Sequence, residues 1–482
     1  MDSLILLVEP GYRSKYPPLG LMKIAQYHKQ KGDHVEFVKG LSCERRDRWR
    51  WDRIYVASLF TYDWAQTLQA LQYYASGAKS PAEENLVVGG VLATLMAEDI
   101  RKVVPCRVVT GLLDQKGKLG YEDDDLIESM LPDYSILDET DYRYPVSNAY
   151  FAYATRGCVR RCSFCAVPTI EPEFKHYLSL TDQIEPVAAN RPKKDLLLLD
   201  NNVLASERFA DIIAEIKRLG FEKGALFTYQ NKSGRRVSGQ RRVDFNQGVD
   251  IRFLTEGKMA LLSEIAIRPL RLAFDHIEYR TLYEEKVRLA AKYGISHLSN
   301  YILFNYIDKP EDLYHRLRWN VELNEELGLQ IFSFPMRYIN LASKNRLAST
   351  PGNVGPHWNR KYLRAIQCVL VKTRGVVGTH LAYFEEAFGD NFDDFNKILI
   401  MPEDYIIHRH DHDGDGSTDA WWRGYCDLSS LEKQQLLSIV ATNDFNDIDS
   451  THMSTRVLRV LDHYLTPNQK EQAFTQSRAL AL

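Results

Sequence analysis

Cysteine is scarce in this chain, and long apolar runs are missing. Seven cysteines in 482 residues are too few for a disulfide scaffold. The longest apolar stretches, at 4–8 and 196–199, fall far short of the roughly 20 residues needed to cross a bilayer. The chain starts with Met1-Asp2 and a strand-like run, without the basic and small-residue segments of a secretory signal. We therefore expect a cytoplasmic protein with no membrane partner.

An excess of charge of one sign is also missing. The chain carries 61 basic and 64 acidic side chains and a net charge of −3. This balance gives no overall positive field of the kind that attracts nucleic acid. It does not exclude a local basic groove. A hydrophobic content of 45% and a charged content of 26% are ordinary for a globular protein. At about 150 residues per domain, the length predicts two to four domains.

Short apolar runs alternate with helical patterns in residues 1–112. Strands are expected at 4–8, 35–38, 52–58, 86–88 and 107–110, and helices at 19–30, 61–75 and 92–103. This alternation implies crossover units and a parallel sheet, so it predicts a small doubly wound domain. Residues 113–150 are acidic and rich in turn residues, which indicates a linker.

The strand–helix alternation resumes in residues 151–345. Strands are expected at 151–155, 196–199, 225–228, 249–253, 270–274, 297–304 and 330–336. Such a segment suits a partial (β/α) barrel, because a full eightfold barrel needs about 250 residues. Residues 346–482 are mixed and mostly helical in pattern. The expected fold class is therefore α/β: a doubly wound parallel sheet, a partial barrel and a mostly helical C-terminal region.

Three of the cysteines fall within eight residues. Cys158, Cys162 and Cys165 have the spacing C-x3-C-x2-C and directly follow an expected strand, where barrel active sites lie. Three thiolates cannot complete a tetrahedral zinc site or ligate all four irons of a cubane cluster. Either a histidine such as His176 completes a zinc site, or a [4Fe–4S] cluster keeps one iron open.

This motif, with Phe164 before its last cysteine, resembles the cluster motif of the radical S-adenosylmethionine (SAM) superfamily. The resemblance implies a [4Fe–4S] cluster held by Cys158, Cys162 and Cys165, with SAM on the unique iron. It implies cleavage of SAM to a 5′-deoxyadenosyl radical that abstracts hydrogen from a substrate. It also implies an electron donor such as flavodoxin or ferredoxin, and Phe164 counts among the cofactor-binding candidates.

The resemblance extends to the first domain. Pro17-Pro18-Leu19-Gly20-Leu21 and Val88-Gly89-Gly90 look like the cobalamin-binding Rossmann domain that precedes many radical SAM barrels. The Asp-x-His-x-x-Gly pattern of histidine-ligated cobalamin is absent, because no histidine precedes His28. Cobalamin is therefore a possible third cofactor, and a domain that merely keeps the fold is the alternative.

Polar residues follow the expected strand at 196–199. In radical SAM barrels, Asp200 and Asn201 would face the SAM amino group or the substrate, and a helix N-cap is the alternative. Arg252 would bind the SAM carboxylate through its planar fork, or form an internal salt bridge with Asp250 or Asp275.

Two further cofactor-binding candidates end later strands. Asp275 could hold a SAM ribose hydroxyl or a substrate group, and Phe334 could pack against the adenine or the core. No catalytic residue is assigned, and His276 is interpreted as a hydrogen-bonded structural residue.

Two other segments carry suggestive patterns. The basic insertion at 230–242 is expected to be a mobile, solvated loop. Residues 411–419 imitate a calcium-binding EF-hand loop, but Trp422 replaces the final Glu, so we expect an acidic loop.

The function that we predict is that of a radical SAM enzyme with an unidentified substrate. One alternative is an RNA methylthiotransferase-like enzyme, which would need three N-terminal cysteines where only Cys43 and Cys106 precede the motif. The other is a non-catalytic metal-binding scaffold protein. A nucleic-acid partner is not expected.

Overall fold

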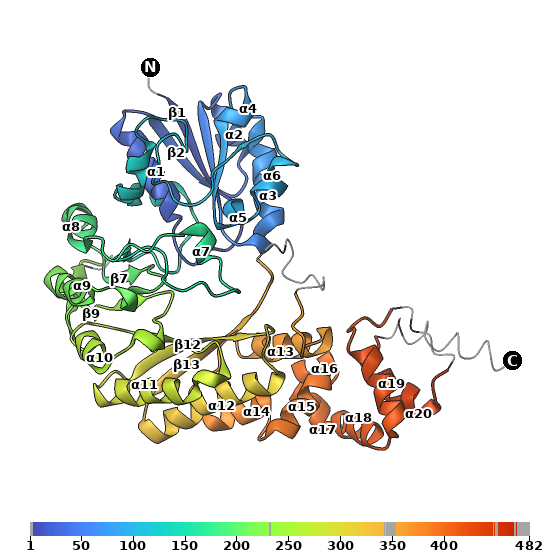
Figure 1. The fold of residues 1–482 in the computed structure, drawn as a ribbon. Helices are drawn as coiled ribbons and strands as arrows, with labels where there is room; N and C mark the ends of the chain where they lie inside the picture. Colours follow the sequence, from blue (N-terminus) through green and yellow to red (C-terminus); the bar gives the residue numbers. More distant parts are fainter. Residues whose placement is uncertain are drawn as a thin grey trace. The chain divides into compact units, whose positions relative to one another are not determined.

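The computed structural model describes residues 3–230, 233–341, 343, 353–446, 448, 452–466 and 469, and Figure 1 shows their fold. The chain forms two compact units, and each is described by itself. Unit 1 comprises Met1–Leu272, Leu289–Ile295 and Ile339–Ala348. Unit 2 comprises Ala273–Arg288, Ser296–Tyr338 and Ser349–Leu482.

Unit 1 begins with a five-stranded sheet in the order β2-β1-β3-β4-β5, whose neighbours all pair in parallel. Its strands are β1 (Leu4–Glu9), β2 (His34–Lys39), β3 (Arg53–Ser58), β4 (Leu86–Gly90) and β5 (Arg107–Val108). Successive side chains of a strand point to opposite faces. Ile5 therefore packs in one core cluster with α1 (Leu19–Gln30), and Leu6 in another with α3 (Trp64–Ala75). Helices cover both faces (Figure 1), so the doubly wound prediction is confirmed.

The other short helices of this first domain connect the strands of the five-stranded sheet. They are α2 (Cys43–Arg48), η1 (Thr61–Asp63), α4 (Ala82–Asn85), α5 (Val91–Leu95) and α6 (Ala97–Arg101). The single helix expected at 92–103 is broken at Met96, whose ψ of 30° is not helical. The segment expected to be a linker forms η2 (Asp124–Ser129) and η3 (Tyr134–Glu139). Ile127 and Ile136 bury against the α1 face of the sheet, so this segment belongs to that core.

A second parallel sheet in unit 1 has the order β10-β7-β6. Its strands are β6 (Ala149–Ala152), β7 (Asp195–Leu198) and β10 (Val243–Phe245). Val249 continues the pattern through a parallel bridge to Leu272 of β11 (Leu270–Ala273). The helices that follow these strands are α7 (Val167–Ile170), α8 (Leu180–Asn190), η4 (Val203–Ala205), α9 (Phe209–Ile216), η5 (Lys217–Phe221), η6 (Ile251–Phe253) and α10 (Glu256–Leu262).

Two expected barrel strands are wrong. Residues 225–228 lie in an exposed antiparallel hairpin of β8 (Leu226–Gln230) and β9 (Arg236–Gln240), which also replaces the loop expected at 230–242. Asn231 and Lys232 of that segment lie outside the described residues. Residues 249–253 mostly form η6, because the Asp250 carboxylate accepts the amide of Arg252 and starts a helical turn. The strand between them, β10, was missed because it is short.

Unit 2 contains a parallel pair of strands, β12 (His297–Phe304) and β13 (Gln330–Arg337), joined by α12 (Pro310–Leu327). Their register sets Asn300 opposite Ser333. The chain reaches this pair through η7 (Ile277–Tyr279) and α11 (Arg280–Lys292).

The C-terminal region of unit 2 is mostly helical, as predicted. Its helices are α13 (Arg360–Lys372), α14 (Leu381–Phe388), α15 (Phe392–Ile400), α16 (Glu403–Ile407), α17 (Arg409–Gly414), α18 (Ser417–Cys426), α19 (Ser430–Val440), α20 (Thr455–Leu461) and η8 (Asp462–Tyr464). The acidic loop expected at 411–419 is wrong. That segment spans α17 and α18, joined at Gly416 with a φ of 79°. The domain boundary predicted at 345–346 lies outside the described residues.

In the described part of the chain, no helix is both long enough and apolar enough to span a membrane.

Candidate functional site

The cysteine loop, residues 158–165, follows the carboxyl end of β6 in unit 1. Asp200, just beyond β7, holds the chain where it leaves β6. Its carboxylate accepts the amide of Ala154 at 3.2 Å and the hydroxyl of Thr155 at 2.6 Å, and it also accepts the amide of Thr155. Burial raises the pKa of Asp200 to about 6, although these hydrogen bonds oppose the shift. Asp200 therefore fixes the start of the loop, and it makes no helix N-cap contact.

Gly157 sets the direction in which the loop leaves the strand. Its φ is 71°, and a Cβ at this position would lie 2.2 Å from the carbonyl oxygen of Glu173. Only glycine fits such a site, because it tolerates a positive φ and has no side chain. The amide of Gly157 donates to Glu171 Oε2 at 2.6 Å, and Asn201 Nδ2 donates to the same oxygen at 3.1 Å.

A buried charge network supports this corner. Arg156 is 5% exposed and pairs with Glu171 at 3.1 Å and with Glu128 at 3.6 Å, and its guanidinium lies 3.8 Å from the centre of the Tyr153 ring. Burial alone would disfavour the charged form, but Tyr153, Glu128 and Glu171 together raise the pKa of Arg156. Lys23 adds a second cation, 3.5 Å from Glu128. The residue before Gly157 is therefore held rigidly.

The three thiols are half-buried, and none of them forms a disulfide. Cys158 Sγ accepts the amide of Arg160 at 3.3 Å and Nδ2 of Asn202 at 3.5 Å. Cys162 and Cys165 close a tight turn, in which the Cys165 amide donates to the Cys162 carbonyl at 3.0 Å. The loop thus carries three sulfur atoms directly after a firmly anchored segment.

The same side chains were tested as a metal centre. Among the residues that the structure describes, no three His, Cys, Asp or Glu side chains gather into a group that could hold a metal ion. The three cysteines share one loop without forming such a group. His176, the histidine considered for a zinc site, faces the amide of Glu207, which donates to its Nδ1 at 3.5 Å.

Arg252 is held by its neighbour Asp250. Arg252 Nε lies 2.7 Å from Asp250 Oδ1, and Nη2 lies 2.8 Å from Oδ2, so the pair is bidentate. The salt-bridge interpretation of Arg252 is therefore the contact seen in the structure. Asp250 also lies 3.5 Å from Asn202 Nδ2, which connects the pair to Cys158.

Asp275 and Phe334 belong to unit 2. The carbonyl of Asp275 accepts Arg316 Nη1 at 2.9 Å. Phe334 is half-buried in β13, and its ring centre lies 6.0 Å from that of Tyr301. Their predicted contacts with a cofactor stay predictions.

Sequence reasoning missed several residues that shape the cysteine loop. Glu171, Glu128 and Arg156 form the charge network. Asn202, which contacts the sulfur of Cys158, was not missed: with Asp200 and Asn201 it belongs to the polar group expected at this strand end. Glu128 carried no usable signal, since it lies 28 positions before Arg156 in an acidic segment.

The first domain contains two histidines that could be considered as cobalamin ligands, His28 and His34. His28 has Nδ1 2.6 Å from Asp33 and Nε2 3.0 Å from the hydroxyl of Tyr55. His34 is the first residue of β2 and pairs with Glu36 at 3.1 Å. Ligands of such sheets bind at the carboxyl ends of the strands. The residues present therefore do not fit a histidine-ligated cobalamin.

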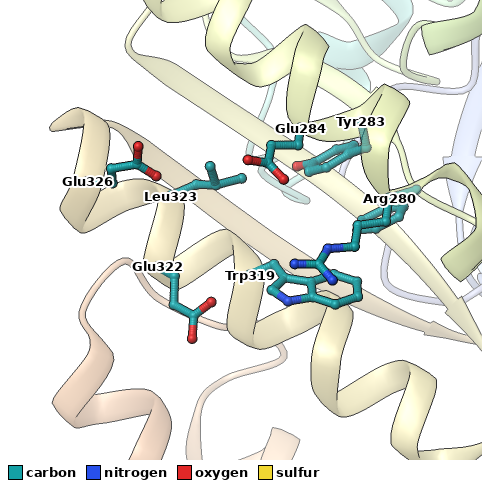
Figure 2. A pocket seen from close by; sticks show the side chains of 8 residues that line it. Arg280, Tyr283, Glu284, Trp319, Glu322, Leu323 and Glu326 are labelled. Carbon is teal, nitrogen blue, oxygen red and sulfur yellow. The ribbon is translucent and has the colours of Figure 1, made fainter.

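Unit 2 carries a shallow pocket of about 100 Å³ between α11 and α12 (Figure 2). Arg280 lies 3.9 Å from the centre of the Trp319 ring. Glu284 and Glu326, which also line the pocket, are bridged by Arg288 at 2.8 and 2.7 Å. Its charges are thus paired within the protein.

Known proteins were compared with this chain. No protein-family model matches the sequence, and no curated protein matches it. A structural likeness was found to TsrM from Kitasatospora setae, a radical S-adenosylmethionine methyltransferase solved with a tryptophan substrate and the SAM analogue aza-SAM. The identity is 15%, the match covers 77% of each chain, and the TM-score is 0.48. A likeness at this level assigns no activity, substrate or cofactor to the present chain.

Proposed function

We propose that this protein is a radical SAM enzyme whose [4Fe–4S] cluster is held by Cys158, Cys162 and Cys165. The observation that carries the proposal is the loop itself. Three half-buried thiols lie on one short segment at the carboxyl end of a parallel strand. Ligands at that end of a strand are the rule in barrel enzymes. A three-thiolate set leaves one iron of a cubane without a protein ligand.

When bound, such a cluster supplies the electron that cleaves SAM to methionine and a 5′-deoxyadenosyl radical. The contribution of the chain is to hold the reacting groups in place and exclude water. Asp200 accepts the backbone amide of Thr155 and Glu171 accepts that of Gly157, so the segment that leads into Cys158 is held in place. Between the cysteines, Val159, Arg160, Arg161 and Ser163 are exposed, and Phe164 is half-buried. We therefore expect the thiols to turn towards one another on loading without repacking of the core.

The surroundings of Cys158 suit a cluster sulfur. Asn202 Nδ2 donates to it, and Asn202 Oδ1 is buried without a hydrogen-bond partner among the described residues. An orphaned buried acceptor costs free energy, and a bound donor would satisfy it. The amino group of SAM is such a donor. As the sequence predicted, Asp200 and Asn201 are placed beside the SAM amino group in this proposal. Arg252 is the candidate for the SAM carboxylate, and Asp275 is the candidate for its ribose.

The decisive experiment is anaerobic reconstitution with iron and sulfide, followed by electron paramagnetic resonance of the dithionite-reduced protein with and without SAM. We expect about four irons per chain and a signal that SAM shifts. Cys162→Ala should lose the signal and all SAM cleavage. Cys426→Ala is the matched control, because Cys426 is exposed and distant in sequence. A cluster that ignores SAM, or cleavage retained in Cys162→Ala, would overturn the proposal.

Two cofactor questions follow from the same proposal. Electron delivery by flavodoxin or ferredoxin is tested by replacing dithionite with either protein in the cleavage assay. Cobalamin in the doubly wound domain would lack a histidine ligand, because His28 and His34 are engaged elsewhere. The absorption spectrum of protein purified with excess cobalamin tests this point.

A further inference from the structure

A small pocket, open on one side, lies in the helical region of unit 2, far in sequence from the cysteine loop. Its volume is about 40 Å³, and its apolar walls come from α15 and α19 and from the residue after α19. These wall residues are Ile400, Leu437, Val440 and Ala441. Asn359, Lys361 and Tyr362 complete the lining at the start of α13.

Lys361 places an ammonium group at this cavity, and no residue that the structure describes is its partner. Its side chain is almost fully buried, with 1% exposure. Lys361 Nζ has no hydrogen-bond partner among the described residues. Burial lowers the pKa of Lys361 to about 8, although Glu403 and Cys368 act in the opposite direction. Lysine is almost never fully buried unless it is paired, and no such pair is formed among the described residues.

The charged neighbours of Lys361 are committed to other groups. Glu403 accepts Arg364 Nε at 2.7 Å and Asn443 Nδ2 at 2.9 Å. Cys368 is 2% exposed, and burial raises the pKa of its thiol. The described residues therefore supply no anion that pairs with Lys361.

The same cavity lies at the positive end of a helix. Asn359 is the N-cap of α13, a helix of 13 residues, and its Oδ1 accepts the amide of Tyr362 at 2.8 Å. The first amides of a helix have no intrahelical acceptor, and the helix dipole favours negative charge there. The ammonium of Lys361 and the helix terminus thus act on the cavity with the same sign.

We propose that this cavity binds a small carboxylate anion of the size of acetate, with its carboxylate paired to Lys361 Nζ. One water-sized group needs about 10–15 Å³ of such volume, so the cavity has room for about three. That space accepts formate or acetate and excludes larger acids. The apolar walls suit a short hydrocarbon tail and offer nothing to a second charge.

The test measures thermal unfolding of the full chain at pH 7 in sodium acetate and in sodium chloride of equal ionic strength. Wild type should melt about 4 °C higher in saturating acetate, because only the folded state binds the anion. Lys361→Met should lose this acetate-specific shift. Lys372→Met, on the exposed end of the same helix, should keep it. Benzoate should have no effect on any variant.

A second measurement uses wild type alone, so it stands even where Lys361→Met does not fold. Reductive methylation by formaldehyde and cyanoborohydride is followed at each lysine by peptide mass spectrometry. Acetate at about ten times its Kd should slow labelling of Lys361 about tenfold and leave Lys372 unchanged. Equal labelling with and without acetate, or an acetate shift retained in Lys361→Met, would overturn the proposal and leave water in the cavity.

Discussion

Asn202 donates a hydrogen bond from Nδ2 to the sulfur of Cys158 across 3.5 Å, while its Oδ1 is buried without a partner among the described residues. This side chain follows β7, and Cys158 follows β6. Two neighbouring strands of one parallel sheet therefore bring an amide to a thiol 44 positions earlier in the chain.

The first prediction concerns that hydrogen bond. Asn202→Leu removes the donor to Cys158, and hydrogen bonds to cluster sulfurs favour the reduced, more negative state. We expect a lower midpoint potential of the reconstituted cluster, measured by a redox titration read by electron paramagnetic resonance. Asn201→Leu is the control, because Asn201 donates to Glu171 instead. Equal potentials for Asn202→Leu and wild type would contradict the contact.

The second prediction concerns Asp200 and pH. Burial raises its pKa from 3.8 to about 6, so the folded state binds more protons than the unfolded state between about pH 4 and 6. Its contribution to stability therefore falls as the pH rises through that window. Asp200→Asn lacks this dependence. The stability advantage of wild type over the variant should shrink by up to about 3 kcal/mol from pH 4 to pH 7.

Urea unfolding at both pH values measures this difference. Asp182→Asn is the control, because Asp182 is exposed on α8. A difference between wild type and Asp200→Asn that is independent of pH would show that Asp200 titrates as a free carboxyl does.

The third prediction concerns Gly157. Gly157→Ala introduces a Cβ 2.2 Å from the Glu173 carbonyl at a φ of 71°, so the chain must shift where the cysteine loop begins. The backbone strain alone costs about 1–3 kcal/mol. We expect a lower melting temperature and reduced iron uptake on reconstitution.

Gly117→Ala separates the two causes. Gly117 has a similar φ of 78° with nothing within 4 Å, so this variant suffers the backbone strain without the clash. It should keep full iron uptake. Equal iron contents in the two variants would mean that the close approach at Gly157 does not position the thiols.

The fourth prediction concerns a buried cation of unit 2. Arg316 is fully buried and donates to the carbonyls of Phe274 and Asp275 at 3.1 and 2.9 Å, and it pairs with Asp308 at 3.2 Å. Arg316→Met leaves these acceptors unpaired, which should cost about 3–5 kcal/mol. Scanning calorimetry measures the loss. Arg288→Met, which removes exposed ion pairs, should cost less than about 1 kcal/mol, and equal losses would contradict the buried network.

Much of the fold could be predicted from local patterns. The helix expected at 19–30 and the strand expected at 297–304 match α1 and β12 at both ends. Both have strong apolar periodicity bounded by turn residues, which is a local property. For the hairpin of β8 and β9, the same reasoning from apolar periodicity gave a wrong prediction. Leu226 and Tyr229 are apolar but exposed. Their apolar pattern therefore comes from a strand that pairs with β9, and not from a strand buried in a barrel.

In the candidate site, too, some features follow from local sequence and others only from tertiary contacts. The sequence by itself determined that three cysteines share one loop after a strand, because spacing along the chain sets that proximity. Only the tertiary structure decided that Asp200 holds Thr155 and that Glu171 holds Gly157. The contact of Asp200 with Thr155 depends on the register that places Ala152 opposite Leu198. The sequence also could not show that Lys361 is buried without a partner among the described residues. A lysine in the first turn of a helix is expected to be exposed, and only the packing of other helices buries it.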